Sequence, residues 1–490
     1  MKEKSVAKNV LLACLLFGML ITTNVFSQVG IGTVTPDESS ILDITSTTQG
    51  LLTPRMTTAQ RTAIVTPADG LIVYDTELKS FYHYNSTTTS WNRMSSDANG
   101  RLKFKRIKST DVLATVLATE KAAGGGSKYL LDAYTLYEIN GTINVDFPIE
   151  LNNAYLVGLD SGEDKLVKAS GDLFTGTTGG SIRVLTLTAT AGKVFNITGG
   201  GTQNLVFRDA IVASSSNVGI IDGFSLVFIS IVQFAGNTTG IVYKDISKLL
   251  ISNTGWFGNN SGTYETLQGT FGLVEKTGGF SEVVGANKGF DVSSNPTING
   301  DAVVRDVVFT GALTTGKYVN GYNPSIYTGY NFNNKWAVNC SGIPVEGDVV
   351  ATGDVNFDYP VGSGASTATS ATAAKLSGTT TSNNLYRFST GATNNKLIYL
   401  GAKKRYFRAA ATFSFQSSNN GLGVFVFYLA KNGTVINQSK VYCGVASSDV
   451  DAATILSTVE MSTNDYIEVW VSRFSGSGDV LTVSLNLVVN

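Results

Sequence analysis

The segments LVFRDAIV at 205–212, FSLVFISIVQF at 224–234 and IVYKDISKLLI at 241–251 are short apolar strands separated by turns rich in Gly, Asn and Ser. Similar strands recur roughly every 20 to 30 residues through the middle of the chain. One such coil cannot bury its inward face alone, but Ile, Val, Leu and Phe gain a shared core when coils stack. The pattern predicts a right-handed parallel β-helix, with a pair of ordinary β-sandwiches as the alternative.

The composition agrees with stacked β-structure. Charged residues make up 15% of the chain, and 52 residues are Gly. Ordinary globular proteins carry about 25% charged residues. Few charges and many turn formers favour strands with tight turns over helices. We therefore expect an all-β protein, with the β-helix followed by a jelly-roll β-sandwich and preceded by a small mixed module.

Shifts in composition divide the chain into segments. Gly124–Ser127 and the Ser/Thr/Ala-rich run at 362–384 have the character of joints. The expected parts are a signal peptide at 1–28, an attachment module at 29–100, a linker or short helix at 101–126, the β-helix at 127–360, a linker at 361–384 and the jelly-roll head at 385–490.

The start of the chain has the layout of a secretory signal peptide. Lys2, Lys4 and Lys8 precede the apolar run 10–22, and VFS at 25–27 would be followed by a cut that leaves Gln28 first. The run is shorter than the roughly 20 apolar residues of a membrane span. Lipidation at Cys14 is a minor alternative, since the apolar run continues beyond it. We expect an exported protein whose mature chain has no membrane span.

The attachment module combines a turn-rich opening, a short helix and a hairpin. Thr57 and Gln60 form a capping-box pattern for a helix through Ile64, and 70–75 with 80–84 predict two strands around a turn. The sequence of this module resembles one that is common on exported surface proteins of Bacteroidota. The resemblance rests on VGIGT at 29–33, ILDI at 41–44, GLLTPRM at 50–56 and TTAQR at 57–61. The module also resembles a phage tail-fibre attachment module. The resemblance implies location and fibre-like assembly, not chemistry.

Two further resemblances concern the body of the chain. FPIEL at 147–151 followed by YLVG at 155–158 resembles the entry coils of pectate-lyase-like β-helices of tailspikes and surface proteins. YLAKNG at 428–433, a hairpin turn of the Asn-Gly kind, and NDYIEV at 464–469 resemble the jelly-roll heads of the C1q and tumour-necrosis-factor superfamily. Those heads are trimers, which implies a homotrimer here. Tyr406, Phe425, Phe427 and Tyr466 would pack in the core or between subunits.

Several kinds of chemistry are excluded by residue counts. His83 is the only histidine, so catalytic triads and His-based metal sites cannot be assembled except around it, and we expect it to be a packed or surface residue. After cleavage only Cys340 and Cys443 remain, without a disulfide framework. The glycine runs lack the context of nucleotide-binding loops. A net charge of −1 gives no reason to expect nucleic acid as a partner. We expect no cofactor and no metal.

Glycoside hydrolysis remains possible, because it needs only two carboxylates. Acidic residues in the expected coils are Asp209, Asp222, Asp245, Glu265, Glu275, Glu282, Asp291 and Asp306. None forms a recognisable pair by spacing, and acids at coil corners are usually solvated turn formers. We therefore expect no catalytic residue.

Aromatic residues gather in a polar, Asn-rich stretch after residue 255. Exposed rings of this kind stack on sugar faces. The candidate glycan-contacting residues are Trp256, Tyr264, Tyr322, Tyr327 and Trp336, and Tyr330 lies in the same stretch. The alternative is that these rings pack the end of the β-helix or a trimer seam, which is the usual outcome for aromatic side chains.

Together these features predict an exported, fibre-like, homotrimeric structural or adhesive protein at the cell surface or outside the cell, binding a surface glycan or a partner protein. One alternative is a tailspike-like polysaccharide depolymerase with paired carboxylates on the β-helix. Another is a virion tail-fibre component.

Overall fold

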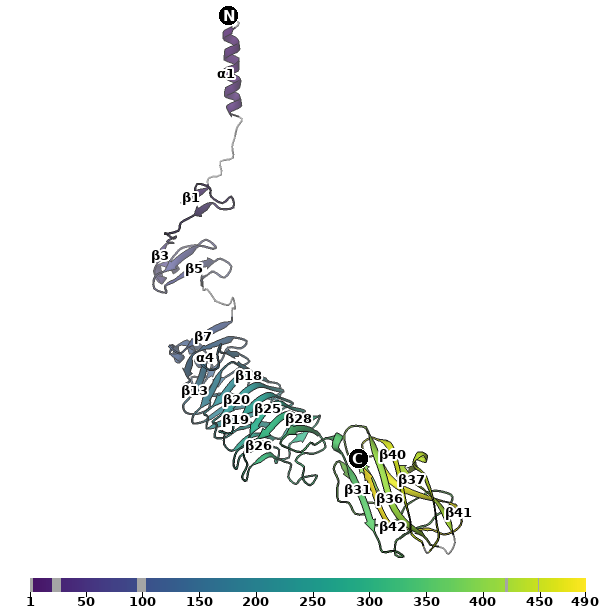
Figure 1. The fold of residues 1–490 in the computed structure, drawn as a ribbon. Helices are drawn as coiled ribbons and strands as arrows, with labels where there is room; N and C mark the ends of the chain where they lie inside the picture. The colour runs from purple at the N-terminus through teal and green to yellow at the C-terminus, as the bar shows by residue number, and fades with distance from the viewer. Residues whose placement is uncertain (1–2, 20–27, 95–102, 419–421, 448) are drawn as a thin grey trace. The chain divides into compact units, whose positions relative to one another are not determined.

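The computed structural model describes residues 3–19, 28–94, 103–418, 422–447 and 449–490 (Figure 1). The chain divides into two compact units, Met1–Leu102 and Lys103–Asn490. The first begins with helix α1 (Glu3–Met19). Among the helices of these described ranges, none has the length and apolarity that a membrane span requires. The expected cleavage motif at 25–27 lies outside the described residues.

A small module follows α1 in the first unit. Its elements are β1 (Val29–Ile31), β2 (Leu42–Ile44), β3 (Arg55–Met56), α2 (Thr58–Thr62), β4 (Ile72–Asp75), β5 (Ser80–Asn85) and β6 (Ser90–Arg93). The capping box is present, since the Thr57 hydroxyl accepts from the Gln60 N–H while the Gln60 side chain accepts from the Thr57 N–H. Strands β4 and β5 form the expected antiparallel hairpin, with Ile72 opposite His83.

Asp75 is the buried charge of this module. Its carboxylate accepts from the Thr58 hydroxyl at 2.8 Å and pairs with Arg61 Nε at 3.1 Å. The Arg61 guanidinium in turn lies 3.9 Å from the centre of the Tyr82 ring. Burial opposes ionisation of Asp75, but hydrogen bonds from Leu78, Thr58 and Arg61 outweigh it and hold its pKa at about 2.

We expect the module to unfold in acid through Asp75. A carboxyl with a lowered pKa stabilises the fold above its unfolded pKa of about 3.9, and the stabilisation is lost as the pH falls toward about 2. His83 is the only histidine, so its NMR signal in histidine-labelled protein reports this module alone. The signal should reach its unfolded position between pH 4 and 2. In Asp75→Asn the signal should be perturbed at neutral pH; a native His83 signal in that variant would contradict the prediction.

The second unit begins with stacked coils of a parallel β-helix of about eight turns. Its first coil includes β7 (Phe104–Lys108), α3 (Leu113–Val116), α4 (Ala118–Ala123) and β8 (Tyr129–Leu130). The next strands are β9 (Leu136–Asn140), β10 (Thr142–Asn144), β11 (Ile149–Glu150), β12 (Tyr155–Val157), β13 (Lys165–Lys168), β14 (Phe174–Gly176), β15 (Gly180–Arg183), β16 (Thr186–Ala189) and β17 (Lys193–Thr198).

The later coils have longer strands. They are β18 (Asn204–Ala213), β19 (Asn217–Asp222), β20 (Leu226–Ala235), β21 (Ile241–Lys244), β22 (Lys248–Trp256), β23 (Thr263–Gln268), β24 (Thr270–Phe271), β25 (Leu273–Glu282), β26 (Lys288–Asp291), β27 (Thr297–Ile298), β28 (Ala302–Thr310), β29 (Lys317–Asn320) and β30 (Trp336–Ser341). Neighbouring coils pair in parallel, so the sandwich alternative for this part is wrong and the β-helix is confirmed.

Two large sheets form the walls of the β-helix. One has 13 strands and runs from β7 to β30, and the other has nine and runs from β8 to β29. Each longer strand of the first wall bends at a residue with positive φ, for example Asp209, Asn253 and Asp306. Inward side chains such as Leu205 and Phe207 are fully buried. β7 belongs to this wall because Ile107 is buried beside β9, although residues 101–126 were expected to be a linker or short helix.

Polar ladders close the turns between the walls. The Asn237 side chain donates to Val212 O and to the Asn260 side-chain oxygen, each at 3.0 Å. Asn260 donates in turn to Phe234 O at 2.7 Å. Stacked amides of this kind satisfy turn backbone groups that the sheets leave unpaired.

The head contains two antiparallel sheets. After the 3-10 turn η1 (Asp348–Val350), its elements are β31 (Gly353–Asp358), β32 (Ala365–Thr367), β33 (Ala374–Lys375), β34 (Phe388–Ser389), β35 (Leu397–Tyr399), β36 (Arg405–Ser417), β37 (Gly423–Lys431), β38 (Thr434–Val435), η2 (Asn437–Ser439), β39 (Val441–Val445), β40 (Asp451–Met461), β41 (Tyr466–Ser475) and β42 (Val480–Val489). One sheet has the order β31-β42-β36-β40, and the other contains β35-β41-β37-β39.

Successive long strands alternate between these sheets, which is the jelly-roll sandwich that the sequence predicts. Phe413 and Phe415 of one sheet pack on Phe427 of the other at ring distances of 4.3 and 4.6 Å. Phe425 is buried as well, whereas Tyr406 is 66% exposed and Tyr466 is half-buried.

The head departs from its expected outline in two segments. β32 and β33 lie within 361–384, the expected linker, and pair with β42 and β41. Residues 435–441 do not form one continuous strand, since η2 lies between β38 and β39; there the Ser439 hydroxyl donates to Ile436 O and accepts from the Leu429 N–H. These short elements lack the alternation that identifies the longer strands.

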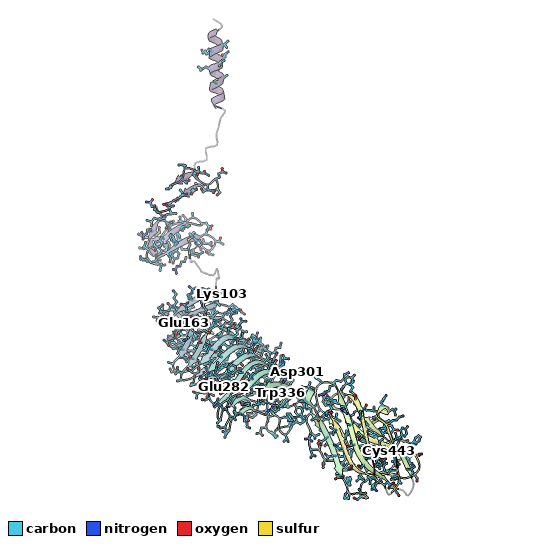
Figure 2. All side chains as sticks on the ribbon, viewed as in Figure 1. Lys103, Glu163, Glu282, Asp301, Trp336 and Cys443 are labelled. Carbon is cyan, nitrogen blue, oxygen red and sulfur yellow. The ribbon has the colours of Figure 1, made fainter. Side chains whose placement is uncertain are left out.

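Arg387 joins the last coil to the head. It is 2% exposed, donates to Trp336 O and pairs with Asp348. Although burial disfavours its charge, the hydrogen bond to Asp348 raises the pKa of Arg387. Asn334 adds a bond from its side-chain amide to Leu400 O at 3.0 Å. Figure 2 labels Trp336 in this last coil and Cys443 in the head, and all three cysteines of the chain are free.

Candidate functional site

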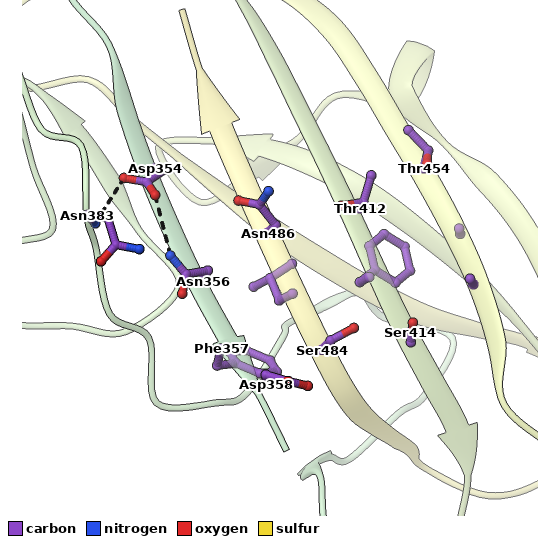
Figure 3. A pocket seen from close by; sticks show the side chains of 14 residues that line it. Asp354, Asn356, Phe357, Asp358, Asn383, Thr412, Ser414, Thr454, Ser484 and Asn486 are labelled. Atoms are coloured by element: carbon purple, nitrogen blue, oxygen red, sulfur yellow. Dashed lines mark hydrogen bonds between the residues drawn. The ribbon is translucent and has the colours of Figure 1, made fainter. Parts of the chain in front are cut away.

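Two adjoining hollows, one in the head and one between the last coil of the β-helix and the head, are the best candidates for ligand contact. The first, which we term the amide hollow, has a volume of about 550 Å³ and lies on the outer face of β31, β42, β36 and β40 (Figure 3). Strand register places Asn356, Asn486, Thr412 and Thr454 in one row across the sheet. A second row contains Asp358, Ser484 and Ser414.

The amide hollow offers hydrogen bonds without a large apolar surface. Its rows carry amide, hydroxyl and carboxylate groups, which complement hydroxyl-rich ligands. Alternation along the strands explains the rows, because every second residue of a half-buried sheet faces outward. Phe413 and Leu485, which separate the polar residues, are buried beneath the surface.

The two carboxylates of this hollow are not arranged for hydrolysis. Asp354 and Asp358 are four residues apart on β31, a separation of about 13 Å between their Cα atoms in an extended strand. Glycosidase carboxyl pairs lie about 5 to 9.5 Å apart. Asp354 also accepts from the backbone N–H groups of Asn383 and Asn384 at 3.2 and 2.7 Å. Its role is therefore to hold the 382–384 loop at the edge of the hollow.

The second hollow, which we term the tyrosine hollow, has a volume of about 810 Å³ and shares Asn383 with the first. Tyr327, Tyr330 and Tyr386 line it together with Thr328 and Asn384. The rings of Tyr330 and Tyr386 are stacked at 4.0 Å, and Tyr330 remains half-buried rather than buried.

Two phenols of the tyrosine hollow, those of Tyr327 and Tyr386, have raised pKa values and stay neutral. Burial raises the pKa of Tyr386 to about 12, against the opposing effect of Arg387. Burial raises the pKa of Tyr327 as well, although its hydroxyl donates to Asn334 at 2.8 Å. Neutral tyrosines beside amides are the usual surface on which a sugar ring stacks and forms hydrogen bonds.

The five aromatic residues suggested by the sequence are all interior. Their exposed fractions are 0% for Trp256 and Tyr264, 8% for Tyr322, 7% for Tyr327 and 1% for Trp336. A buried ring has no free face for a sugar, so these residues are not stacking platforms in this structure. Tyr327 borders the tyrosine hollow, and Trp336 borders a separate cavity of about 330 Å³. The packing alternative describes them better: Trp256 stacks between Phe234 at 4.0 Å and Tyr264 at 5.2 Å.

Most acidic residues suggested by the sequence have structural partners. Asp209 and Asp306 pair with the preceding arginine at bends, Glu282 accepts from the Gly258 N–H, and Asp291 accepts from the Ser293 N–H. Glu265 lies inside the β-helix against Lys276. Glu275 faces outward from β25 between buried neighbours.

Asp222 and Asp245 differ from the other acidic residues, because these two carboxylates share one partner, Lys244. Their carboxylates lie 3.0 and 3.6 Å from Lys244 Nζ, so the two acids are close enough to flank a single sugar linkage. Hydrogen bonding and charge from Asp222 raise the pKa of Lys244. Asp245 also accepts from the Thr270 N–H at 2.8 Å. The cation between the acids favours a structural ion pair over a catalytic one.

No group of three or more His, Cys, Asp and Glu side chains that could hold a metal ion occurs in the described ranges. His83, in β5, is half-buried beside aromatic residues of the hairpin, and its Nδ1 atom has no hydrogen-bond partner in the described chain.

One region of the chain matches a known protein family. Residues 30–110 match the family described as "Phage tail like trimerisation region". This match covers the small module and ends two residues after β7, the first strand of the β-helix wall. No curated protein matches the chain.

The solved structures that match this chain have low sequence identity and low TM-scores. The tailspike gp49 of Acinetobacter baumannii bacteriophage Fri1, described as a capsular polysaccharide depolymerase, is 8% identical over 89% of this chain and 98% of that chain, with a TM-score of 0.23. ORF18 of Geobacillus virus E2 is 12% identical over 83% and 89%, with a TM-score of 0.24. WceF of Pantoea stewartii, described as a glycan biofilm modifying enzyme, is 10% identical over 86% and 65%, with a TM-score of 0.21. These values give no basis for transferring a residue, a substrate or an activity.

The amide hollow was not found from the sequence. Its residues are the outward members of ordinary alternating strands, which any solvent-facing sheet shares. The only signal is their chemistry: Thr412, Ser414, Ser484 and Asn486 are small and uncharged, where an exposed strand more often carries long charged side chains.

Proposed function

We propose that this protein is a trimeric, fibre-like attachment protein that adheres to a surface glycan through its head. The match of residues 30–110 to a phage-tail-like trimerisation region carries the proposal. A parallel β-helix joined to a jelly-roll head suits such a role, since stacked coils make a rigid stalk. The resemblance of the head to C1q-type trimers points the same way. An exported cell-surface protein and a virion fibre are the two settings in which it would act.

The glycan is suggested by the two hollows. They place amides and hydroxyls of β31, β36 and β42 beside the stacked rings of Tyr330 and Tyr386. Aromatic faces and amide groups are the complementary surface for a pyranose ring, which has apolar C–H faces and hydroxyl edges.

We expect the native protein to have three times the mass of its chain and to bind its surface polysaccharide. Tyr330→Ala should weaken binding by up to about tenfold, since aromatic stacking contributes about 0.5–1.5 kcal/mol. Asn486→Ala should weaken it by loss of a hydrogen-bonding amide in the amide hollow. Mass comes from light scattering, and affinity from biolayer interferometry on immobilised polysaccharide.

Tyr442→Ala is the matched control. Tyr442 is 51% exposed on β39 and pairs with Phe474 at a ring distance of 5.3 Å, outside both hollows. It should bind like the native protein. A monomeric mass would contradict the trimer, and equal affinities for the Tyr330, Asn486 and Tyr442 variants would contradict the site.

A depolymerase is the second candidate, because Asp222 and Asp245 lie close enough together to flank one sugar linkage. Incubating the native protein with its surface polysaccharide tests this activity, because cleavage would release new sugar ends. Release by the native protein that is lost in Asp222→Asn and in Asp245→Asn would support cleavage at this pair. Binding without release would leave attachment as the function.

A further inference from the structure

One outward column of the 13-stranded wall is apolar along almost the whole β-helix. Strand register aligns Phe104, Tyr155, Val206, Phe228, Leu250 and Val303 from coil to coil. Leu136 lies between Phe104 and Tyr155, and Ala337 ends the column. Only Ser181 and Glu275 interrupt it with polar side chains.

These side chains point away from the core. Val206 lies between Leu205 and Phe207, which are both fully buried, and side chains alternate along a strand. Phe228, Leu250 and Val303 are half-buried in the same alternating pattern, and Tyr155 is 40% exposed. A large phenyl ring on the outside of a sheet is costly in water unless something covers it.

The other wall lacks such a column. Its outward residues in register are Asn196, Ile220, Val242, Thr266, Asp291 and Asn320, of which two are apolar. The next outward column of the first wall is polar and basic, and includes Arg183, Arg208 and Arg305. The apolar column is thus a feature of one face, bordered by charge.

We propose that this column is the surface through which the β-helices of three copies of the chain contact one another. The occupant is a second copy because the column is continuous with the trimerisation region: the match at 30–110 includes the whole of β7, and Phe104 of β7 begins the column. Chains joined at that region start their β-helices at one height and in one direction, so equal residues meet.

This inference rests on the proposed trimer and adds which face of the β-helix is buried in it. It predicts that equal residues of the column approach one another closely. Residues of the opposite wall, such as Val242 on β21, lie on the outside of the assembly.

Disulfide trapping tests the arrangement on the full chain. Phe228→Cys and Leu250→Cys should each form a covalent dimer under mild oxidation, seen on a denaturing gel without reductant, at several times the yield of Val242→Cys. The unsubstituted protein, with its own Cys14, Cys340 and Cys443, sets the background. Circular dichroism and light scattering verify that each variant is folded and keeps its native mass.

The outcomes distinguish failure of the proposed trimer from failure of the proposed contact surface. A monomeric mass for the native protein overturns both the proposed trimer and this surface. A trimeric mass with Phe228→Cys and Leu250→Cys at background, or with Val242→Cys the better cross-linker, overturns the surface alone. Selective cross-linking of the two column variants supports it.

Discussion

Replacing Lys276 with Met should lower the free energy of unfolding by about 3–5 kcal/mol, because it leaves a buried carboxylate without its counter-charge. Lys276 Nζ lies 2.8 Å from Glu265 Oε2, and both side chains are 1% exposed. Lys276 occupies the inward column between Ile251 and Val304, and Glu265 the facing column between Ile241 and Phe290. The pair therefore replaces two apolar side chains inside the stack.

The surroundings of the Glu265–Lys276 pair offer few other partners if one of the two charges is removed. The ammonium has one further hydrogen bond, to Thr254 Oγ1 at 3.2 Å, and neither carboxylate oxygen of Glu265 has a hydrogen bond in good geometry within the described chain. The buried Tyr243 nearby keeps its proton, since burial and the charge of Glu265 raise its pKa. Within the described chain Lys276 is the cation that pairs with Glu265, so a lone Glu265 carboxylate loses its solvation without replacement.

Guanidinium unfolding at one protein concentration measures the effect. Glu265→Leu combined with Lys276→Met should recover most of the lost stability, since apolar residues of similar volume replace buried ion pairs well. Lys248→Met, at an exposed position of β22, is the control and should change stability little. A single variant as stable as this control, or a double variant less stable than either single one, would count against the buried pair.

Trp256→Ala should cost a comparable amount, about 3–5 kcal/mol, through the cavity it leaves. The indole stacks on Phe234 with an angle of 5° between the planes and on Tyr264 with an angle of 11°. All three rings are fully buried, so the coils cannot collapse into the space without moving two neighbouring rings.

The same variant separates packing from recognition. Because Trp256 is inside the β-helix, protein that remains folded should bind glycan as the native protein does, while its unfolding midpoint falls. Trp256→Phe should lose less, and Trp470→Ala, at a half-buried position of β41, should lose less than Trp256→Ala. A selective loss of glycan affinity with unchanged stability would contradict the buried packing role.

The outward apolar column and the buried Glu265–Lys276 pair are two features that sequence patterns could not predict. Alternation identifies Val206 and Phe228 as outward once the strands are known, but it cannot align them, since the turns between coils vary in length. The strand register brings them into one column. Likewise Glu265 and Lys276 both read as ordinary charges, and only the facing of two walls buries them together.

Local periodicity and turn chemistry were enough to predict the class of structure, including the apolar strands between Gly and Asn turns, the Thr57 capping box and the alternating strands after residue 384. The tertiary structure alone decided exposure. It buried Trp256 and Trp336, which the sequence suggested for glycan contact, and joined Asn356, Asn486 and Thr412 from distant strands into one surface. The physical reason is that burial depends on what packs above each strand, and that partner comes from elsewhere in the chain.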